Sequence, residues 1–215
     1  MMKVFTIPVT PFQQNCSLLV CQKTGKAAVV DPGGEVDRIV AAIEQVGADV
    51  EKILITHGHI DHAGGAKELA ERLDVPIEGP HREDAFLLKA LAEQGLRYGF
   101  AGARSFVPDR WLEDGDTVTV GELRFNVVHC PGHTPGHVVY VHPEQRFAVV
   151  GDVLFNGSIG RTDFPRGDYA TLIHSIREKL FPLGDDIQFL PGHGPASTFG
   201  AERAHNPFVG DAAVG

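Results

Sequence analysis

A short segment near position 60 carries side chains that could bind metal ions. Residues 56–62 read Thr-His-Gly-His-Ile-Asp-His, which brings three imidazoles and one carboxylate close together in the chain. Zinc and iron accept such ligands at roughly 2.0 to 2.2 Å, and two histidines separated by one residue can chelate one ion from an extended backbone. Histidine-rich segments also occur as solvated loops, but such a loop has no reason to surround an aspartate with histidines directly after an apolar run. The segment therefore predicts a metal site.

Three later positions repeat this pattern of a polar ligand at a turn that follows an apolar run. They are His133, Asp152 and His193. Burying a carboxylate at the end of an apolar strand costs free energy unless a cation or hydrogen-bond donors meet it. A carboxylate can also bridge two cations with its two oxygens, and we expect this role for Asp152.

The number of candidate ligands predicts two ions rather than one. A single tetrahedral zinc that also keeps a water has too few positions for the whole set. We expect two divalent ions, zinc in the first place and iron or manganese as the alternatives, separated by roughly 3.5 to 4 Å. One ion would take His57, His59 and His133, the other would take Asp61, His62 and His193, and Asp152 and a hydroxide would bridge them. Asp61 and Asp152 are then the expected catalytic residues.

Other polar residues near these ligands receive supporting or structural interpretations. His129 continues the inward alternation of the preceding strand, so we expect it to pack in the core. We expect His137 and Asp31 to brace the ligands from behind, an ordinary turn aspartate being the alternative for Asp31. Three further histidines lack the strand-then-turn pattern and are left out of the site; these are His81, His142 and His174.

The elements that must position these loops alternate between strands and helices. The hydrophobic pattern predicts strands at residues 4–7, 17–21, 27–30, 52–55, 137–141, 147–150 and 187–190, and a hairpin formed by 118–120 and 123–127. It predicts amphipathic helices at 36–46, 66–73, 86–95 and 169–180, the last capped by Asp168, and a loop at 97–109. The ligands would therefore lie in loops at strand ends.

Composition indicates one globular domain spanning residues 1–215. A chain of this length with 43% hydrophobic residues can bury roughly 70% of its unfolded surface. The formal net charge of -9 gives no basic surface for nucleic acid or an anionic membrane, so we expect neither partner. The three cysteines show no CxxC spacing, so we expect them to be reduced and packed; they are Cys16, Cys21 and Cys130. With no signal-peptide pattern and no transmembrane span, we expect a cytoplasmic protein.

The ordered motif resembles the metallo-β-lactamase superfamily along nearly the whole chain. The match consists of His57-Gly58-His59-Ile60-Asp61-His62, followed by His133, Asp152 and His193. The resemblance implies an α/β (α+β) fold, a four-layer αββα sandwich with a dinuclear site along one edge. Further motifs look like those of the short bacterial glyoxalase II-like hydroxyacylglutathione hydrolases; these are Asp31-Pro32-Gly33-Gly34, residues 129–137, residues 151–155, residues 190–195 and residues 202–208.

This narrower resemblance implies hydrolysis of glutathione thioesters, such as S-lactoylglutathione, by a hydroxide that bridges the metals. Two departures concern the substrate. The sequence leaves only a short segment after His193, so we expect no C-terminal helical substrate-binding domain, and Arg161-Thr162-Asp163 stands where longer members have Lys-x-Tyr. We expect Arg161 to bind a glutathione carboxylate, a structural ion pair with a nearby aspartate being the alternative. Arg166 and Arg203 are expected to be structural.

Two other readings remain open from the sequence. The chain also resembles persulfide dioxygenases, in which a single iron would use two histidines and one carboxylate, here His57, His133 and Asp152, and which consume oxygen. A structural or storage metal site is the non-catalytic alternative, although structural zinc usually has a closed shell rich in cysteine. β-Lactamase, lactonase and RNA-processing activities also occur in the superfamily.

Overall fold

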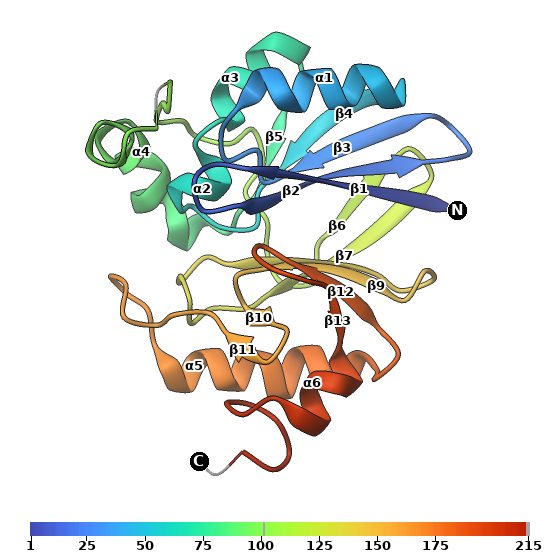
Figure 1. Cartoon of the computed structure of the whole chain (residues 1–215), viewed down its shortest axis with the longest axis vertical. Helices are drawn as coiled ribbons and strands as arrows, with labels where there is room; N and C mark the ends of the chain where they lie inside the picture. The colour runs from blue at the N-terminus through green and yellow to red at the C-terminus, as the bar shows by residue number, and fades with distance from the viewer. Residues whose placement is uncertain (101, 214–215) are drawn as a thin grey trace.

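Two β-sheets face each other, and helices cover the outer face of each (Figure 1). The computed structural model describes residues 1–100 and 102–213. The first sheet comprises β1 (Met2–Val9), β2 (Gln14–Cys21), β3 (Lys26–Val30), β4 (Asp49–Leu54) and β5 (Ile77–Glu78), in that spatial order. The second comprises β6 (Thr117–Val120), β7 (Leu123–His129), β8 (Val138–His142), β9 (Phe147–Gly151), β12 (Gln188–Pro191) and β13 (Ser197–Thr198), in the order β13-β12-β9-β8-β7-β6. The αββα architecture expected from the sequence is confirmed.

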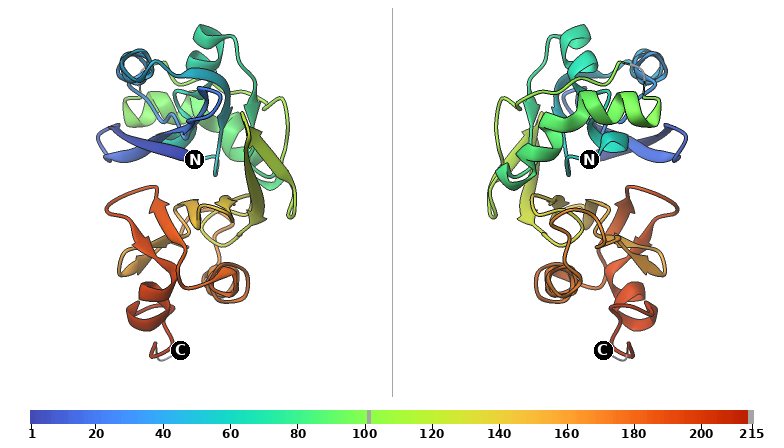
Figure 2. Two further views of the ribbon diagram at one scale, coloured as in Figure 1. Left: turned by 90° about the vertical axis from the view of Figure 1, so that its right-hand side faces the viewer. Right: turned by 90° about the vertical axis from the view of Figure 1, so that its left-hand side faces the viewer.

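Each sheet contains parallel strands whose crossovers supply the outer helices. In the first sheet β3, β4 and β5 run parallel, and α1 (Val36–Val46) and α3 (Ala66–Leu73) make the crossovers. In the second sheet β9 and β12 run parallel, and the crossover contains α5 (Tyr169–His174), which continues through a π-helical turn at Ser175–Leu180. Parallel strands need such long connections, and these usually contain helices that cover the sheet. Figure 2 shows these helices outside the two sheets.

The remaining elements are short or lie near the strand ends. They are α2 (Ile60–Ala63), the 3-10 turn Arg82–Asp84, α4 (Ala85–Tyr98), the small hairpin of β10 (Leu154–Phe155) and β11 (Ser158–Ile159), the 3-10 turn Phe181–Leu183, and α6 (Phe199–His205). Among the helices of the described residues, none has the length and apolar character needed to cross a membrane.

Alternation along the strands builds a core on both faces of each sheet. On β2, Leu18 packs with the helices outside the first sheet, whereas Leu19 packs between the sheets with Phe125 and Tyr140. Successive side chains of a strand point to opposite faces, so a strand buried on both sides is apolar throughout. The Tyr140 hydroxyl donates a hydrogen bond of 2.7 Å to the backbone oxygen of Ile55, which fastens the second sheet to the end of β4.

The structure differs from the sequence-based expectation at three places. Helix α4 runs past Gly95 to Tyr98, because a Cβ on Gly95 would lie 2.8 Å from Ala103 and the glycine allows this close packing rather than ending the helix. The strand predicted at 137–141 is displaced by one residue, so that the buried His142 is the last residue of β8. His129 is only half-buried: its ring stacks on that of His81 at 4.1 Å, at the margin of the core.

Candidate metal centre

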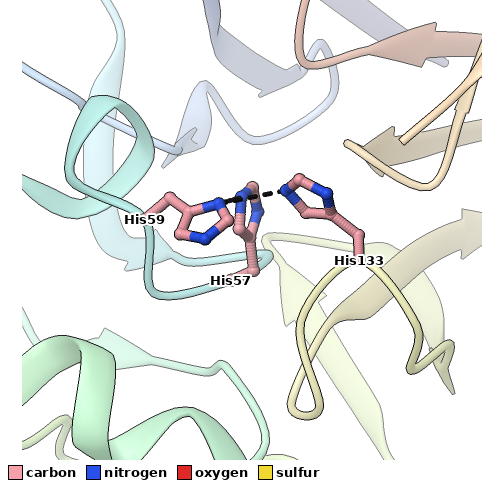
Figure 3. Close-up of side chains that lie close together, drawn as sticks. All are labelled: His57, His59 and His133. Atoms are coloured by element: carbon pink, nitrogen blue, oxygen red, sulfur yellow. Dashed lines mark hydrogen bonds between the residues drawn. The ribbon is translucent and has the colours of Figure 1, made fainter. Parts of the chain in front are cut away.

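The first group of candidate ligands joins loops from the two sheets. His57 and His59 lie in the loop between β4 and α2, and His133 lies in the loop between β7 and β8. Figure 3 shows the three rings meeting from these two loops. The Nδ1 atom of His59 lies 3.1 Å from Nε2 of His57 and 3.0 Å from Nε2 of His133. Three ligand nitrogens around a tetrahedral zinc would lie roughly 3.3 Å apart, so the spacing fits a single cation.

The hydrogen bonds behind these rings favour a cation between them. His133 donates from Nδ1 to the backbone oxygen of Arg161 at 2.7 Å. The Thr56 hydroxyl donates to Asp31 at 2.6 Å, which leaves its oxygen to accept from Nδ1 of His57 at 3.0 Å. The Nε2 atoms of His57 and His133 therefore both present lone pairs to His59, and one proton on His59 cannot satisfy both. A metal ion can accept all of these lone pairs.

The second group brings together Asp61, His62 and His193. The Oδ2 atom of Asp61 lies 3.1 Å from Nε2 of His193 and 3.7 Å from Nε2 of His62. Asp61 and His62 lie in the short helix α2, whereas His193 follows β12 near the end of the chain. His193 donates from Nδ1 to the backbone oxygen of Phe12 at 3.1 Å, so its Nε2 faces the other two side chains.

Asp152 stands between the two groups, at the end of β9. Its Oδ1 lies 3.3 Å from Nε2 of His62, and its Oδ2 lies 3.6 Å from Nε2 of both His133 and His193. Nε2 of His62 and Oδ1 of Asp152 are buried and have no hydrogen-bond partner among the described residues. Buried polar atoms are rarely left without a partner. A metal ion bound between these two atoms would supply the missing partner for both. Gly192 permits the close approach, because a Cβ there would lie 2.1 Å from Oδ1 of Asp152.

Burial and charge divide the imidazoles into two classes. Burial lowers the pKa of His57, His59 and His133, that of His59 to about 3, so this group is neutral and ready to ligate. Burial also opposes the charged form of His62 and His193, but the carboxylates of Asp61 and Asp152 outweigh it and raise both pKa values. The second group therefore binds protons more readily than the first, and a cation must compete with them there.

Two further side chains hold the ligands from behind. Asp31, at the end of β3, accepts hydrogen bonds from the backbone nitrogen of Thr56 at 2.7 Å and from Nδ1 of His62 at 2.9 Å. His137 accepts a bond from the backbone nitrogen of Asp152 at 3.0 Å through Nε2, and its ring stacks on that of His57 at 4.6 Å. Both residues thus touch the groups that we expected them to brace.

The loop that follows β11 covers one side of the first group. The Phe164 ring packs edge-on against His59, with ring centres 4.7 Å apart. The Arg161 guanidinium lies over that ring at 4.6 Å and pairs with Asp163 through Nε at 2.9 Å and Nη2 at 2.7 Å. The structural ion pair considered for Arg161 is therefore present, and its Nη1 remains outside that pair.

Two arginines and the C-terminal motif have structural contacts. Arg166 pairs with Glu83, and Arg203 pairs with Asp185, as their expected structural roles require. Within the motif of residues 202–208, the buried Glu202 accepts hydrogen bonds from Gly157, Ser197 and Asn206. That motif fastens α6 to the β10–β11 turn.

Sequence reasoning missed Asp84, a fully buried carboxylate at the end of the 3-10 turn. Asp84 accepts hydrogen bonds from the backbone nitrogens of Gly58 and Gly136 and from the Thr134 hydroxyl. In the sequence it is one of two adjacent acidic residues before an apolar helix, a pattern typical of a solvated helix start. No local signal distinguishes it from such a residue.

Comparisons with known proteins agree with this geometry. The family described as the metallo-beta-lactamase superfamily matches residues 9–193. A relative from Haemophilus influenzae, hydroxyacylglutathione hydrolase GloC, is 47% identical over 97% of this chain and 98% of its own. The crystal structure of TTHA1623 in a di-iron-bound form is similar with a TM-score of 0.86 and 36% identity, covering 95% of this chain and 99% of that one. The BLEG-1 B3 metallo-beta-lactamase gives a TM-score of 0.88 with 33% identity, covering 96% and 99%. The chain therefore belongs to the metallo-β-lactamase superfamily.

Proposed function

We propose that this protein is a metal-dependent hydrolase of glutathione thioesters such as S-lactoylglutathione. The observation that carries the proposal is Asp152, whose two oxygens lie 3.3 to 3.6 Å from nitrogens of both ligand groups. A carboxylate in this place is suited to bridge two cations. The substrate class is supported by the relative from Haemophilus influenzae, which is named hydroxyacylglutathione hydrolase and matches nearly end to end.

The residues can be assigned to the steps of thioester hydrolysis. When bound, two divalent cations would lower the pKa of a water to about 7 and polarise the thioester carbonyl. We assign His57, His59 and His133 to the first cation and Asp61, His62 and His193 to the second.

Asp61 and the leaving group account for the proton movements. Asp61, whose side chain is 16% exposed, would orient the attacking water, accept its proton and then pass that proton to the departing thiolate, which restores the Asp61 carboxylate and gives the free thiol. Asp152 would keep the two cation positions close together. Because a thiolate is a good leaving group, the reaction needs no strong general acid.

Arg161 is our proposed contact for a glutathione carboxylate. Its guanidinium is exposed beside the first group, and Asp163 engages Nε and Nη2 but not Nη1. The arginine is thus held in place with one nitrogen left to meet an anionic substrate, which this acidic chain must attract locally.

For the metal itself we propose zinc, because imidazole and carboxylate are ligands that it accepts readily. Iron is the alternative that metal analysis must decide, since the similar structure of TTHA1623 is a di-iron form. The three buried free cysteines fit a reducing compartment, and we propose that the protein works in the cytoplasm.

The test is hydrolysis of S-lactoylglutathione by protein whose content of two metal ions per chain has been verified. We expect metal-dependent release of thiol, loss of turnover on chelation, and a fall of at least about 100-fold in kcat/KM for Asp152→Asn. Asp186→Asn, which changes an exposed aspartate paired with Arg146, is the matched control and should retain activity. Failure to release thiol with both ions in place would falsify this substrate class.

A persulfide dioxygenase is the second candidate. It would need one iron held by His57, His133 and Asp152 and would consume oxygen with glutathione persulfide. Asp61, His62 and His193 favour the hydrolase, because a single-iron site has no use for a second ligand group. Iron-loaded protein that consumes oxygen with the persulfide, while thioesters are left intact, would reverse this preference.

A further inference from the structure

The buried carboxylate of Asp84 links the two loops that carry the first ligand group. Its Oδ2 accepts from the backbone nitrogen of Gly58 at 2.9 Å and from the Thr134 hydroxyl at 2.8 Å, and its Oδ1 accepts from the backbone nitrogen of Gly136 at 2.6 Å. Gly58 separates the two histidines of one loop, and Thr134 directly follows His133 in the other.

The surrounding backbone is shaped to bring Asp84 this close. A Cβ on Gly136 would lie 2.5 Å from the backbone nitrogen of Asp84, and a Cβ on Gly58 would lie 2.7 Å from Cβ of Leu87. The backbone of His81 adds one more tie, since its nitrogen donates to the oxygen of Gly136 at 3.0 Å. The start of α4 is therefore packed against both ligand loops at positions where only glycine fits.

A carboxylate is a costly choice for this position. Asp84 is fully buried, and burial raises its pKa to about 6 although three donors favour the charged form. An apolar side chain would avoid the cost of burial but could not accept bonds from two loops at once. A buried carboxylate is explained at this position if binding of the first metal ion depends on the distance between the two ligand loops.

We propose that Asp84 is a positioning residue that sets the spacing of the His57–His59 loop and the His133 loop for the first metal ion. This inference rests on the proposed ligand groups but not on the substrate. Another tie between the same regions, from the backbone nitrogen of Val138 to the oxygen of Thr56 at 2.8 Å, lies on the strand side of the loops. That bond holds the residue before His57, whereas Asp84 holds the residues that directly follow His57 and His133.

The test is a zinc titration against a competing chelator, with no substrate present. Asp84→Asn should weaken binding of the first ion by roughly 10- to 100-fold, because the amide nitrogen of asparagine cannot accept from the donors it would face. Binding of the second ion, whose ligands Asp84 does not contact, should change much less. Cobalt(II) absorption of the loaded protein should shift as well, since it reports the geometry of the ligands.

Glu202→Gln is the matched control for the burial of a carboxylate. Glu202 is also buried and also accepts from three donors, the backbone nitrogen of Gly157 at 2.9 Å, the Ser197 hydroxyl at 2.5 Å and the Asn206 amide at 2.8 Å. Its variant should lose stability without losing zinc affinity. Equal effects of the two variants on zinc affinity, or an unchanged affinity for Asp84→Asn, would overturn the proposal.

A second pair of variants keeps the proposal testable if Asp84→Asn does not fold. Thr134→Val removes one donor to Asp84 without changing the size of the side chain, and Thr134→Ser retains the hydroxyl. We expect weaker first-ion binding in the valine variant and near-normal binding in the serine variant, and equal binding in both refutes the role. If the unaltered protein binds fewer than two ions, the proposed function fails, and that result is obtained before any variant is made.

Discussion

At the scale of single residues, the centre is a set of imidazoles whose outer nitrogens are already committed. His62, His133 and His193 each donate from Nδ1 to an oxygen, namely a carboxylate of Asp31 and two backbone carbonyls. Such bonds fix both the tautomer and the orientation of a ligating ring. We therefore expect the residues behind the candidate ligands to influence metal affinity together with those ligands.

His137→Phe tests this dependence. Phenylalanine preserves the stacking on His57 but removes the nitrogen that accepts from the backbone of Asp152. We expect metal affinity to fall by roughly 10- to 100-fold, measured by chelator competition. His174→Phe, at an exposed histidine of α5, is the control and should bind metal normally. Unchanged affinity in His137→Phe would show that the backbone of Asp152 needs no such partner.

The two ions should differ in their response to pH. His62 and His193 have raised pKa values, so they keep protons above the usual imidazole value of about 6.5, and metal must displace those protons. Burial lowers the pKa values of His57, His59 and His133, so these rings stay neutral as the pH falls.

Lowering the pH stepwise should therefore release the second ion before the first. Metal content after dialysis at each pH measures this directly. Loss of both ions together would contradict the division into two classes.

At the scale of elements, loops at strand ends carry the chemistry and longer elements hold them in place. The loop between β11 and α5 is the one that we connect with substrate, through Arg161, whose guanidinium lies over the Phe164 ring. Arg166 fastens the far end of this loop by pairing with Glu83 and lying over Phe86 at 5.1 Å. Glu83 and Asp84 are adjacent, so the turn before α4 contacts three loops of the site.

Arg161→Ala should raise KM for a glutathione thioester by roughly 10-fold with a smaller effect on kcat, because an arginine–carboxylate contact acts in binding. Arg161→Lys keeps the charge but not the two-point pairing with Asp163. Its KM should lie between those of the alanine variant and the unaltered protein. Steady-state kinetics on S-lactoylglutathione provide both constants. A KM that does not move in Arg161→Ala would remove the arginine from the binding site.

The sequence predicted the elements that are long enough to show a period. Helix α1 and the hairpin of β6 and β7 were predicted nearly to their ends, because their apolar residues repeat over several positions. Two-residue strands such as β5 and β13 show no period, and they form only because longer neighbours lie beside them.

The candidate site could be predicted where ligand type and a preceding strand coincide, as at His133 and Asp152. No local sequence pattern predicts that these side chains meet, because their meeting depends on two sheets facing each other. Asp84 escaped prediction for the same reason: its partners Gly58 and Gly136 are distant in sequence, and only the fold brings them to it.

At the scale of the whole molecule, the candidate metal centre joins the two sheets. The first group draws on loops of both, and the second is closed by His193 near the end of the chain. Asn15 on β2 reaches across to the backbone oxygens of Pro191 and Gly194, at 3.0 and 2.9 Å, which holds the His193 loop against the first sheet. That residues 1–215 act as one domain stays a prediction, which the core shared by the two sheets supports.

Metal removal should therefore lower the stability of the entire chain. Each ion present at about 100 times its Kd adds about 2.7 kcal/mol to the free energy of unfolding, which corresponds to about 5 to 11 °C in Tm for a protein of this size. Calorimetry with and without a chelator measures the shift, and restoring zinc should reverse it. If Tm is the same with and without metal, the centre does not hold the sheets together.

The order of the ligands along the chain also sets an order in time. Every side chain of the first group has been synthesised once His133 has left the ribosome, whereas the second group waits for His193. At about 5 to 20 residues per second, the interval between them lasts roughly 3 to 12 seconds. A nascent chain thus contains all three imidazoles of the first group before the carboxylate-rich group is complete, so the first group is available to a metal ion earlier in synthesis than the second.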